Sequence, residues 1–261
     1  MESLKNKLNE KIQKSIRYVG DITILFLRAA LWMTIPPFKH ERTFQQAKRV
    51  GVDSFLIVSL VALFTGIILA LQTAYQMQKL SSEIYIANLV AVSIVRELGP
   101  VLTALIVAGR IGAAITAEIG TMNVTEQVDA LSTLAANPIK YLVVPRLLAL
   151  ALMLPVLTIY ADLLGIFGGY LICVFKLKIG AAMYIRMSID ALAVKDIVTG
   201  LIKTVFFGML ISLVACHEGL HVEGGAEGVG KATTVSVVTS FILIIVSDCF
   251  FTALFYFIFK S

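Results

Sequence analysis

The sequence has few of the residues on which soluble and disulfide-bonded proteins depend. Only 15% of its 261 residues are charged, and only three are cysteines. Cys173, Cys216 and Cys249 lie far apart within apolar runs and form no C-x-x-C pair. Neither a structural zinc site nor a disulfide framework is therefore indicated. The lysine-rich first twenty residues have no early apolar stretch and no cleavage site, so a cleavable signal peptide is not expected.

Long apolar runs, by contrast, are abundant. Hydrophobic residues make up 58% of the chain, and its mean hydropathy is +0.89. Soluble domains average about 45–50% apolar residues. A helix needs about 20 apolar residues to cross the hydrocarbon core of a bilayer, and five runs are long enough. They predict an all-α integral membrane protein with five transmembrane helices over residues 54–78, 84–117, 147–175, 197–216 and 232–259.

The first fifty residues form a region of different character, with ten Lys and Arg against four acidic residues. Leu4, Leu8, Ile12 and Ile16 repeat at helical spacing, which gives a basic helix one apolar stripe. Residues 22–35 are apolar except for Arg28, but too few to span. We expect two interfacial helices here, and a solvated basic arm is the alternative. The expected division is an amphipathic interfacial or cytoplasmic region, 1–50, and a transmembrane domain, 51–261.

Basic residues outside the spans predict the orientation. If the N-terminus is cytoplasmic, the basic arm, Lys140, Arg146 and Lys231 all lie on the cytoplasmic side. The positive-inside rule favours this arrangement, which places the C-terminus outside. The segment 176–196 carries four basic residues on the outer side and is the weakest part of the assignment.

Charged residues also lie within the apolar runs. They are Arg96, Glu97, Arg110, Glu118, Asp162, Lys203 and Asp248. A charge at the centre of a bilayer costs at least about 2.5–3.5 kcal/mol, so such residues usually have a function or a partner. Arg110, Glu118, Asp162 and Asp248 are expected to form structural ion pairs. For Arg96, Glu97 and Lys203, a cavity lining and internal pairing are both open.

A polar segment follows Gly120 and predicts a short helix. Asn123 is placed to cap it, with Glu126 at the third helical position facing back. An apolar face follows the helical period, and Asn137-Pro138 is expected to end the helix. In the predicted orientation this helix is cytoplasmic, between the second and third spans. It is either a docking element or an ordinary connector.

Two near-motifs carry alternative functions. Residues 225–232 nearly match a phosphate-binding loop, but Ala232 replaces the hydroxyl residue that would bind Mg²⁺. We expect a flexible cytoplasmic loop there, and ATP bound elsewhere.

His217-Glu218-Gly219-Leu220-His221 fits H-E-x-x-H, the pattern of a zinc hydrolase. Gly219 inside the motif, nearby Gly224-Gly225 and the lack of an obvious third ligand favour a polar helix end instead.

The run RELGPVLTALIVAGRIGAAITAEIGTMNVTEQVDAL, residues 96–131, closely resembles the MlaE permease family. The resemblance continues through Asn137-Pro138, Pro145-Arg146, Ala161-Asp162 and residues 223–234. It implies an N-terminal interfacial region followed by five transmembrane helices in a homodimer. It also implies the membrane subunit of an ABC transporter that moves phospholipid or a related lipid with Mce-domain proteins. The expected location is a bacterial inner membrane, with the C-terminus in the periplasm.

The same resemblance assigns roles to residues. The segment matching 122–136 is the coupling helix that docks on the ATPase subunit, and its candidate residues are Asn123, Thr125, Glu126, Gln127, Asp129 and Leu131. The region around Arg96 borders a lipid cavity, whose candidate lining residues are Gln72, Tyr75, Arg96, Glu97 and Lys203. ATP and Mg²⁺ are expected on the partner ATPase, with no cofactor, metal, catalytic residue or nucleic-acid partner for this chain.

Two other classes of function stay open at this point. One is an intramembrane zinc hydrolase that uses residues 217–221. The other is an ATP-independent secondary transporter, suggested by Arg96, Glu97 and Asp162 within the spans.

Overall fold

The computed structural model describes residues 2–34, 40–79 and 85–258, and the described chain is helical with no β-strand. Five helical segments are long and apolar enough to cross a membrane, which confirms the predicted class and number. Each segment is longer than its apolar run, because helix continues into the flanking polar residues. They are Glu41–Gln78, Ile86–Val124, Ile139–Phe175, Val194–Leu220 and Gly225–Ile258.

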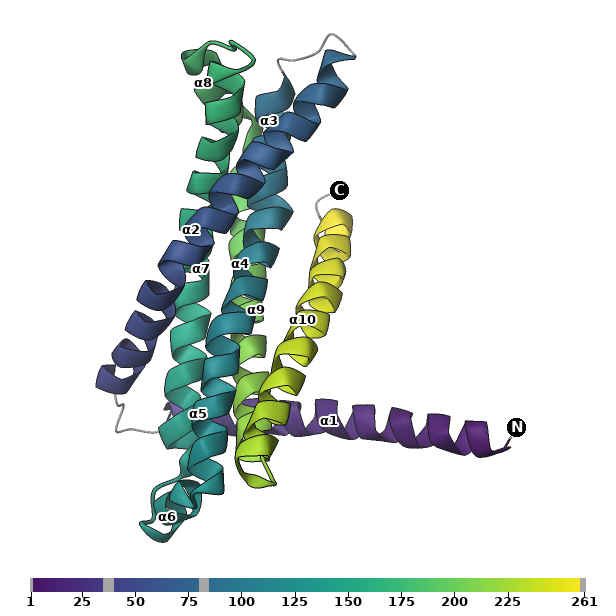
Figure 1. Cartoon of the computed structure of the whole chain (residues 1–261), viewed down its shortest axis with the longest axis vertical. Helices are drawn as coiled ribbons and strands as arrows, with labels where there is room; N and C mark the ends of the chain where they lie inside the picture. The colour runs from purple at the N-terminus through teal and green to yellow at the C-terminus, as the bar shows by residue number, and fades with distance from the viewer. Residues whose placement is uncertain (1, 35–39, 80–84, 259–261) are drawn as a thin grey trace.

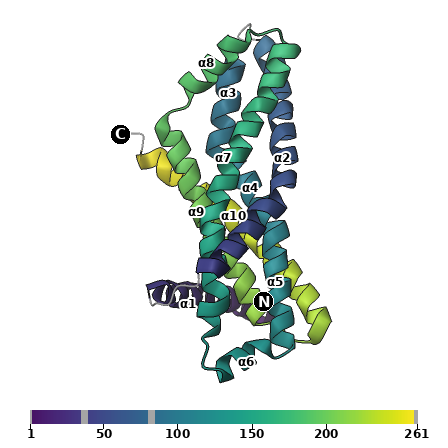
Figure 2. The ribbon, with the colours of Figure 1, turned by 90° about the vertical axis from the view of Figure 1, so that its left-hand side faces the viewer.

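Three of these segments are single α-helices and two contain π-helical turns. The single helices are α2 (His40–Gln78), α9 (Val194–Leu220) and α10 (Gly225–Ile258). The second span consists of α3 (Ile86–Ser93), η2 (Ile94–Leu98), α4 (Gly99–Val107), η3 (Ala108–Gly112) and α5 (Ala113–Val124). The third consists of η4 (Ile139–Val143) and α7 (Val144–Phe175). Short α6 (Gln127–Thr133) precedes the third span and α8 (Ala181–Ala191) follows it, at opposite ends of the bundle (Figures 1 and 2).

The N-terminal region is one helix, not the two that the sequence predicted. Helix α1 (Glu2–Thr34) runs across the end of the bundle that carries α6 (Figure 1). Ile22, Leu25 and Ala29 are buried against the bundle, whereas Ile16 is 67% exposed. The turns from residue 20 onward therefore have an inward-facing apolar stripe. Helix α2 already begins at His40, so the predicted boundary at residue 50 falls inside it.

The glycine-rich segment 225–232 is also helical, so the expected flexible loop is wrong. Gly224 and Gly225 have φ angles of +87° and +68°, and α10 starts at Gly225. Left-handed backbone is readily adopted only by glycine, which explains a tight turn between α9 and α10 at this point. The remaining glycines of the motif belong to the first turns of α10.

Close backbone contact between α2 and α7 organises one side of the bundle. A Cβ atom on Gly66 would lie 1.9 Å from the carbonyl oxygen of Gly165, and one on Gly168 would lie 2.3 Å from that of Leu63. Lipid chains are as apolar as leucine, so helices in a membrane associate through such close packing. These small residues let the backbones of the first and third spans meet directly.

Gly66→Ala should destabilise the protein, because the added methyl group would overlap the Gly165 carbonyl. We expect a loss of about 1–3 kcal/mol, typical of overpacking. Gly230→Ala is the control, since a Cβ atom there meets no atom within 4 Å. SDS titration in mixed micelles, followed by circular dichroism, measures both variants. Equal stability of the two would contradict the close α2–α7 contact.

Candidate functional sites

The first candidate site begins with a π-helical turn in the second span. Segment η2 covers Ile94–Leu98 and is followed by α4, with Pro100 in its first turn. Proline has no N–H group, so a regular hydrogen-bond ladder is already interrupted here. A π-turn inserts an extra residue and changes which way the side chains face. Arg96 and Glu97 lie in this turn and contact different residues.

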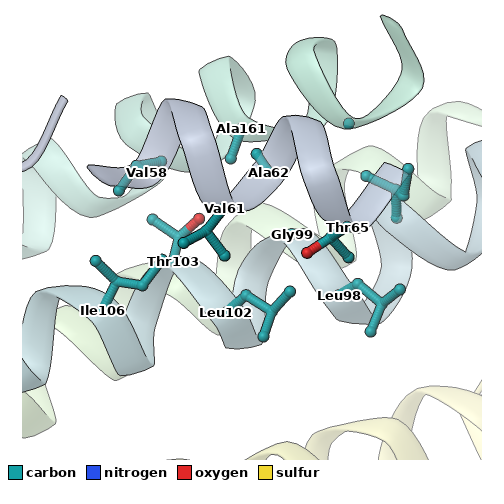
Figure 3. A pocket seen from close by; sticks show the side chains of 12 residues that line it. Val58, Val61, Ala62, Thr65, Leu98, Gly99, Leu102, Thr103, Ile106 and Ala161 are labelled. Carbon is teal, nitrogen blue, oxygen red and sulfur yellow. The ribbon is translucent and has the colours of Figure 1, made fainter. Parts of the chain in front are cut away.

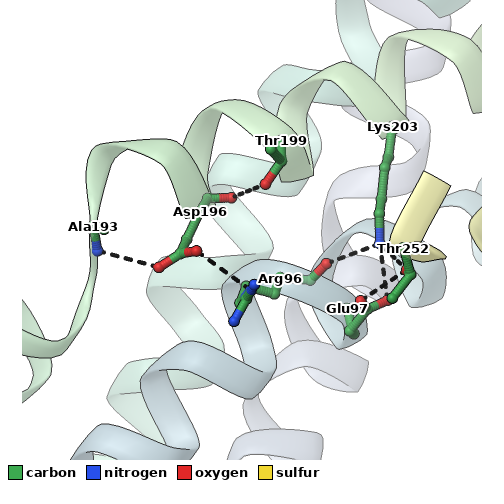
Figure 4. A network of polar contacts seen from close by, with 7 residues as sticks. All are labelled: Arg96, Glu97, Ala193, Asp196, Thr199, Lys203 and Thr252. Carbon is green, nitrogen blue, oxygen red and sulfur yellow. Dashed lines mark hydrogen bonds and ion pairs between the residues drawn. The ribbon is translucent and has the colours of Figure 1, made fainter. Parts of the chain in front are cut away.

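Lys203 of α9 is the buried centre of a polar network (Figure 4). Its side chain is 3% exposed, and the ammonium group donates to the carbonyl of Arg96 (3.3 Å), to Glu97 Oε2 (3.0 Å) and to Thr252 Oγ1 (2.7 Å). Those three bonds use all its protons. The Thr252 hydroxyl in turn donates to Glu97 Oε1 at 3.0 Å.

Two further acids complete the charge balance around this network. Asp248 Oδ1 of α10 lies 2.9 Å from Lys203 Nζ. The guanidinium of Arg96 pairs with Asp196 at the start of α9, with Nε 3.3 Å from Oδ1, and Asp196 also accepts from the Ala193 amide. The network therefore joins the second, fourth and fifth spans through groups that are individually costly to bury.

An open cavity of about 370 Å³ adjoins the network, and a second one of about 450 Å³ continues along α10. Both are lined by Glu97, Thr252 and Tyr256. The predicted grouping of Arg96, Glu97 and Lys203 at one cavity is thus found in the structure. Gln72 and Tyr75 of α2 are exposed and line neither cavity.

Asp248 and Thr252 join this site although the sequence did not place them there. Asp248 was expected to form a structural pair, and Thr252 was not singled out. Neither has a local signal, because both reach Lys203 only through the packing of α10 on α9. The closest indication in the sequence is that an acidic residue and a hydroxyl residue lie one helical turn apart in an apolar helix.

Asp162 of α7 lies beside the same π-turn but outside the ionic network. Its Oδ1 atom is buried without a hydrogen-bond partner, and no ion pair of Asp162 is found among the described residues. A Cβ atom on Gly99 would lie 1.7 Å from that oxygen. The expected structural pair is therefore wrong for Asp162. The narrow pocket between α2 and α4 that Gly99 helps to line is almost wholly apolar (Figure 3).

Glu118 and Arg110 were also expected to form ion pairs, and the structure shows such pairs for Glu118. Glu118 of α5 binds two arginines, Arg49 Nη1 of α2 at 2.5 Å and Arg146 Nη2 of α7 at 2.7 Å. Arg110 is exposed and forms no ion pair in the described part of the chain, contrary to the prediction. Glu118 lies near the end of the second span that leads into α6, so it ties this end to both α2 and α7.

The second candidate site is the turn from α5 into α6. The sequence suggested that Asn123 caps α6, but this is wrong, because α5 continues to Val124. The side-chain amide of Asn123 instead donates to the Val222 carbonyl at 3.1 Å. Glu126 precedes α6 in left-handed conformation with φ +60° and makes no capping bond. The Asn137 side chain accepts from the amides of Ile139 and Lys140, so it starts the next helix instead of ending α6.

Most candidate coupling residues lie on an exposed surface. Thr125, Glu126, Gln127 and Asp129 are exposed, Leu131 is half-buried, and Val128 is buried beneath them. Leu134 is 77% exposed just after α6, which the sequence analysis missed. The short helix thus offers acids, amides and one leucine at the tip of the bundle (Figure 2).

The two histidines near the end of α9 pack on aromatic rings. The His217 ring is 5.1 Å from that of Tyr18 and 4.4 Å from that of His221. His221 Nδ1 lies 2.7 Å from the His217 carbonyl oxygen. Across the residues that the structure describes, no three His, Cys, Asp or Glu side chains gather as metal ligands would. Burial raises the pKa of the Tyr18 phenol. The contact between Tyr18 of α1 and His217 of α9 anchors α1 to α9.

These features define a multi-pass membrane protein with a polar network inside its bundle and an exposed short helix at one end. Comparison with known proteins identifies the class. The family described as Permease MlaE matches residues 43–254. A probable ABC transporter permease protein of Rickettsia conorii is 40% identical over 254 residues, covering 97% of this chain and 98% of the relative.

More distant organisms have relatives as well. A probable ABC transporter permease of Synechocystis is 39% identical over 232 residues, covering 86% of this chain and 88% of the relative. The Arabidopsis thaliana chloroplastic protein trigalactosyldiacylglycerol 1 is 37% identical over 214 residues, covering 82% and 61%. The chain belongs to the MlaE permease family. It is a transport subunit of the ABC permease type and not a catalytic enzyme.

Lys203→Met should strongly destabilise the protein, because Glu97 and Asp248 would remain without their cation. We expect a loss of about 1.5–3 kcal/mol, typical of lost hydrogen bonds to charged groups, because Glu97 is 40% exposed and stays partly hydrated. Arg186→Met is the matched control, because the Arg186–Asp190 pair has side chains 85% and 69% exposed. Exposed helical pairs contribute only about 0.3–0.5 kcal/mol. Similar losses for both variants in SDS titration would show that the Lys203 network contributes little.

Proposed function

We propose that this permease moves phospholipid or a related lipid across or out of a bacterial inner membrane, driven by a separate ATPase subunit. The observation that carries the proposal is the cavity beside Lys203. Charged and hydroxyl groups lie at one part of its wall, and Phe255, Tyr256 and Phe257 line the adjoining parts. A polar group next to an apolar wall suits a molecule with a headgroup and hydrocarbon chains.

The comparisons support a lipid as cargo without identifying it. The Arabidopsis relative bears the name of a galactolipid, trigalactosyldiacylglycerol. The family resemblance also supports an Mce-domain protein as the partner that exchanges lipid at the outer end. We propose both the lipid cargo and the Mce-domain partner for this protein. In this proposal the cavity receives the lipid headgroup near Lys203, and the hydrocarbon chains lie along α10.

A homodimer is part of the same proposal, because α10 lacks cover within one chain. Only 6% of the residues in its most apolar stretch are buried, against 50–61% for the second, third and fourth spans. Ile242, Ile245, Val246 and Phe250 are all more than half exposed. A second copy packed near this face would enclose the open cavities between two chains.

The ATPase is proposed to dock on α6 from the cytoplasm. Helices α1 and α6 lie at the same end of the bundle (Figure 1), so the basic arm and the docking surface share one side. The positive-inside rule favours a cytoplasmic position for this side. Glu126 and Asp129 give the docking surface its negative charge, and Leu134 gives it an apolar anchor.

Reversing both acids, Glu126→Lys with Asp129→Lys, should abolish transport while leaving the cavity intact. In liposomes that contain the complete complex, the native protein should move a fluorescent phospholipid only when ATP is supplied. The double variant should lose at least about tenfold in ATPase co-purification, since each reversed charge pair costs more than about 1 kcal/mol at an interface.

The matched control is Glu227→Lys with Lys231→Glu, which reverses an exposed pair at the start of α10. This control should retain ATPase binding and transport. Full ATPase binding by the Glu126 and Asp129 variant would refute the docking assignment. An intact complex that hydrolyses ATP but moves no phospholipid would refute the lipid assignment.

A further inference from the structure

Another polar cavity, of about 460 Å³, lies at the α6 end of the bundle, away from the Lys203 network. The first turns of α2, the end of α5 and the start of the third span enclose it. Its polar lining residues are Arg42, Gln45, Gln46, Glu118, Tyr141 and Arg146, with Glu41 exposed beside them. The proposed transport of lipid makes no use of this cavity.

Arg146 is the most deeply buried charge in the wall, with its side chain only 5% exposed. Nη1 donates to the Leu142 carbonyl at 2.8 Å, and Nη2 donates to Glu118 Oε1 at 2.7 Å. The Nε atom is buried and has no acceptor in the described chain. A buried donor of a charged group without an acceptor is costly, so this guanidinium has unused capacity for an anion.

Two guanidinium groups, of Arg42 and Arg146, and two carboxylates, of Glu41 and Glu118, line the cavity, and Arg49 adds a third guanidinium beside Glu118. Glu118 is shared between Arg146 and Arg49, with its Oε2 atom 2.5 Å from Arg49 Nη1. Arg42 lies over the Tyr141 ring, 3.4 Å from its centroid, and donates to the Tyr141 hydroxyl. Glu118, 35% exposed, thus serves two guanidinium groups, and the other carboxylate, Glu41, is exposed at the rim.

The height of the cavity suits the headgroup region of a bilayer. Lys140, next to Tyr141, lies over the Trp32 ring at 5.3 Å from its centroid. Tryptophan, tyrosine and basic side chains gather where a membrane meets water. An anion that enters between α2 and α7 at this level would meet Arg42 at the rim and Arg146 inside.

We propose that this cavity is a binding site for a phosphate-bearing anion, held by the guanidinium groups of Arg42 and Arg146. Guanidinium groups match phosphate oxygens with paired, charge-assisted hydrogen bonds. The Gln45 and Gln46 amides supply neutral donors beside them. The phosphate belongs either to the headgroup of a lipid in the adjacent leaflet or to free phosphate ion, since the chemistry of recognition is the same.

Native mass spectrometry of the full-length protein tests this site with three probes: phosphatidylglycerol, diacylglycerol with the same chains, and inorganic phosphate. Phosphatidylglycerol should be retained at least about tenfold better than diacylglycerol, and Arg42→Gln should remove most of that difference. Arg42→Lys should restore part of it, and Glu118→Gln should not weaken retention. Displacement by millimolar phosphate identifies the free ion as a ligand, whereas retention identifies the lipid headgroup.

Arg17→Gln is the matched control, because Arg17 is an exposed arginine of α1 at the same end of the bundle. It should retain phosphatidylglycerol as the native protein does. Arg42 lies at the rim, so its loss should leave the fold intact, as circular dichroism can verify. Equal retention by Arg42→Gln and the native protein, or equal retention of the two lipids, would overturn the site.

Discussion

The burial of one ammonium group constrains much of this structure. Lys203 lies inside an apolar bundle, where an uncompensated charge would be very unfavourable. Its three protons and its charge are compensated by the second span, through Arg96 and Glu97, and by the fifth, through Asp248 and Thr252. Three spans must therefore keep one arrangement at this level. Because the cavities lie beside these same groups, movement of α10 relative to α9 would change both the ion pairs and the cavity.

The opposite end of the bundle is held together in a comparable way by Glu118. This carboxylate binds α2 through Arg49 and α7 through Arg146, two helices that also pack glycine to glycine higher up. Asn123, a little further on, is bonded to the turn between α9 and α10. A force applied at α6 would thus reach the first, third, fourth and fifth spans within a few residues. Both ends depend on a carboxylate shared among basic or hydroxyl partners.

Features that depend on length and average composition could be predicted from the sequence. The five spans follow from hydropathy, and the polar site could be anticipated from Arg96, Glu97 and Lys203, because charges in apolar runs are few and expensive. The exposed short helix within 122–136 could be located by its polarity and by family resemblance. The N-terminal region was predicted as helical, but as two helices where one is found, and with an apolar stripe ending at Ile16, which is 67% exposed.

Specific partners could not be predicted, because they depend on packing between distant segments. Neighbouring Arg96 and Glu97, in the π-turn at 94–98, pair with Asp196 and Lys203 of α9, and helical spacing alone does not reveal these partners. Asn123 fits a capping pattern, yet the Val222 carbonyl, 99 residues away, is its acceptor. The glycines of 225–232 suggest a loop, but only Gly224 and Gly225 have positive φ and the rest are helical. Local preference was overridden by tertiary contacts in each case.

Cys249 offers the most direct measurement of coupling between α6 and the cavity. It is the one exposed cysteine of the three in the described chain, and it lines the cavity along α10. In the reconstituted complex, the rate at which a maleimide modifies Cys249 reports access to that cavity. We expect a several-fold change in this rate between nucleotide-free and ATP-trapped complexes, and no change when Glu126 and Asp129 are reversed to lysine. A rate that stays the same in both nucleotide states of the native complex would contradict coupling between α6 and the cavity.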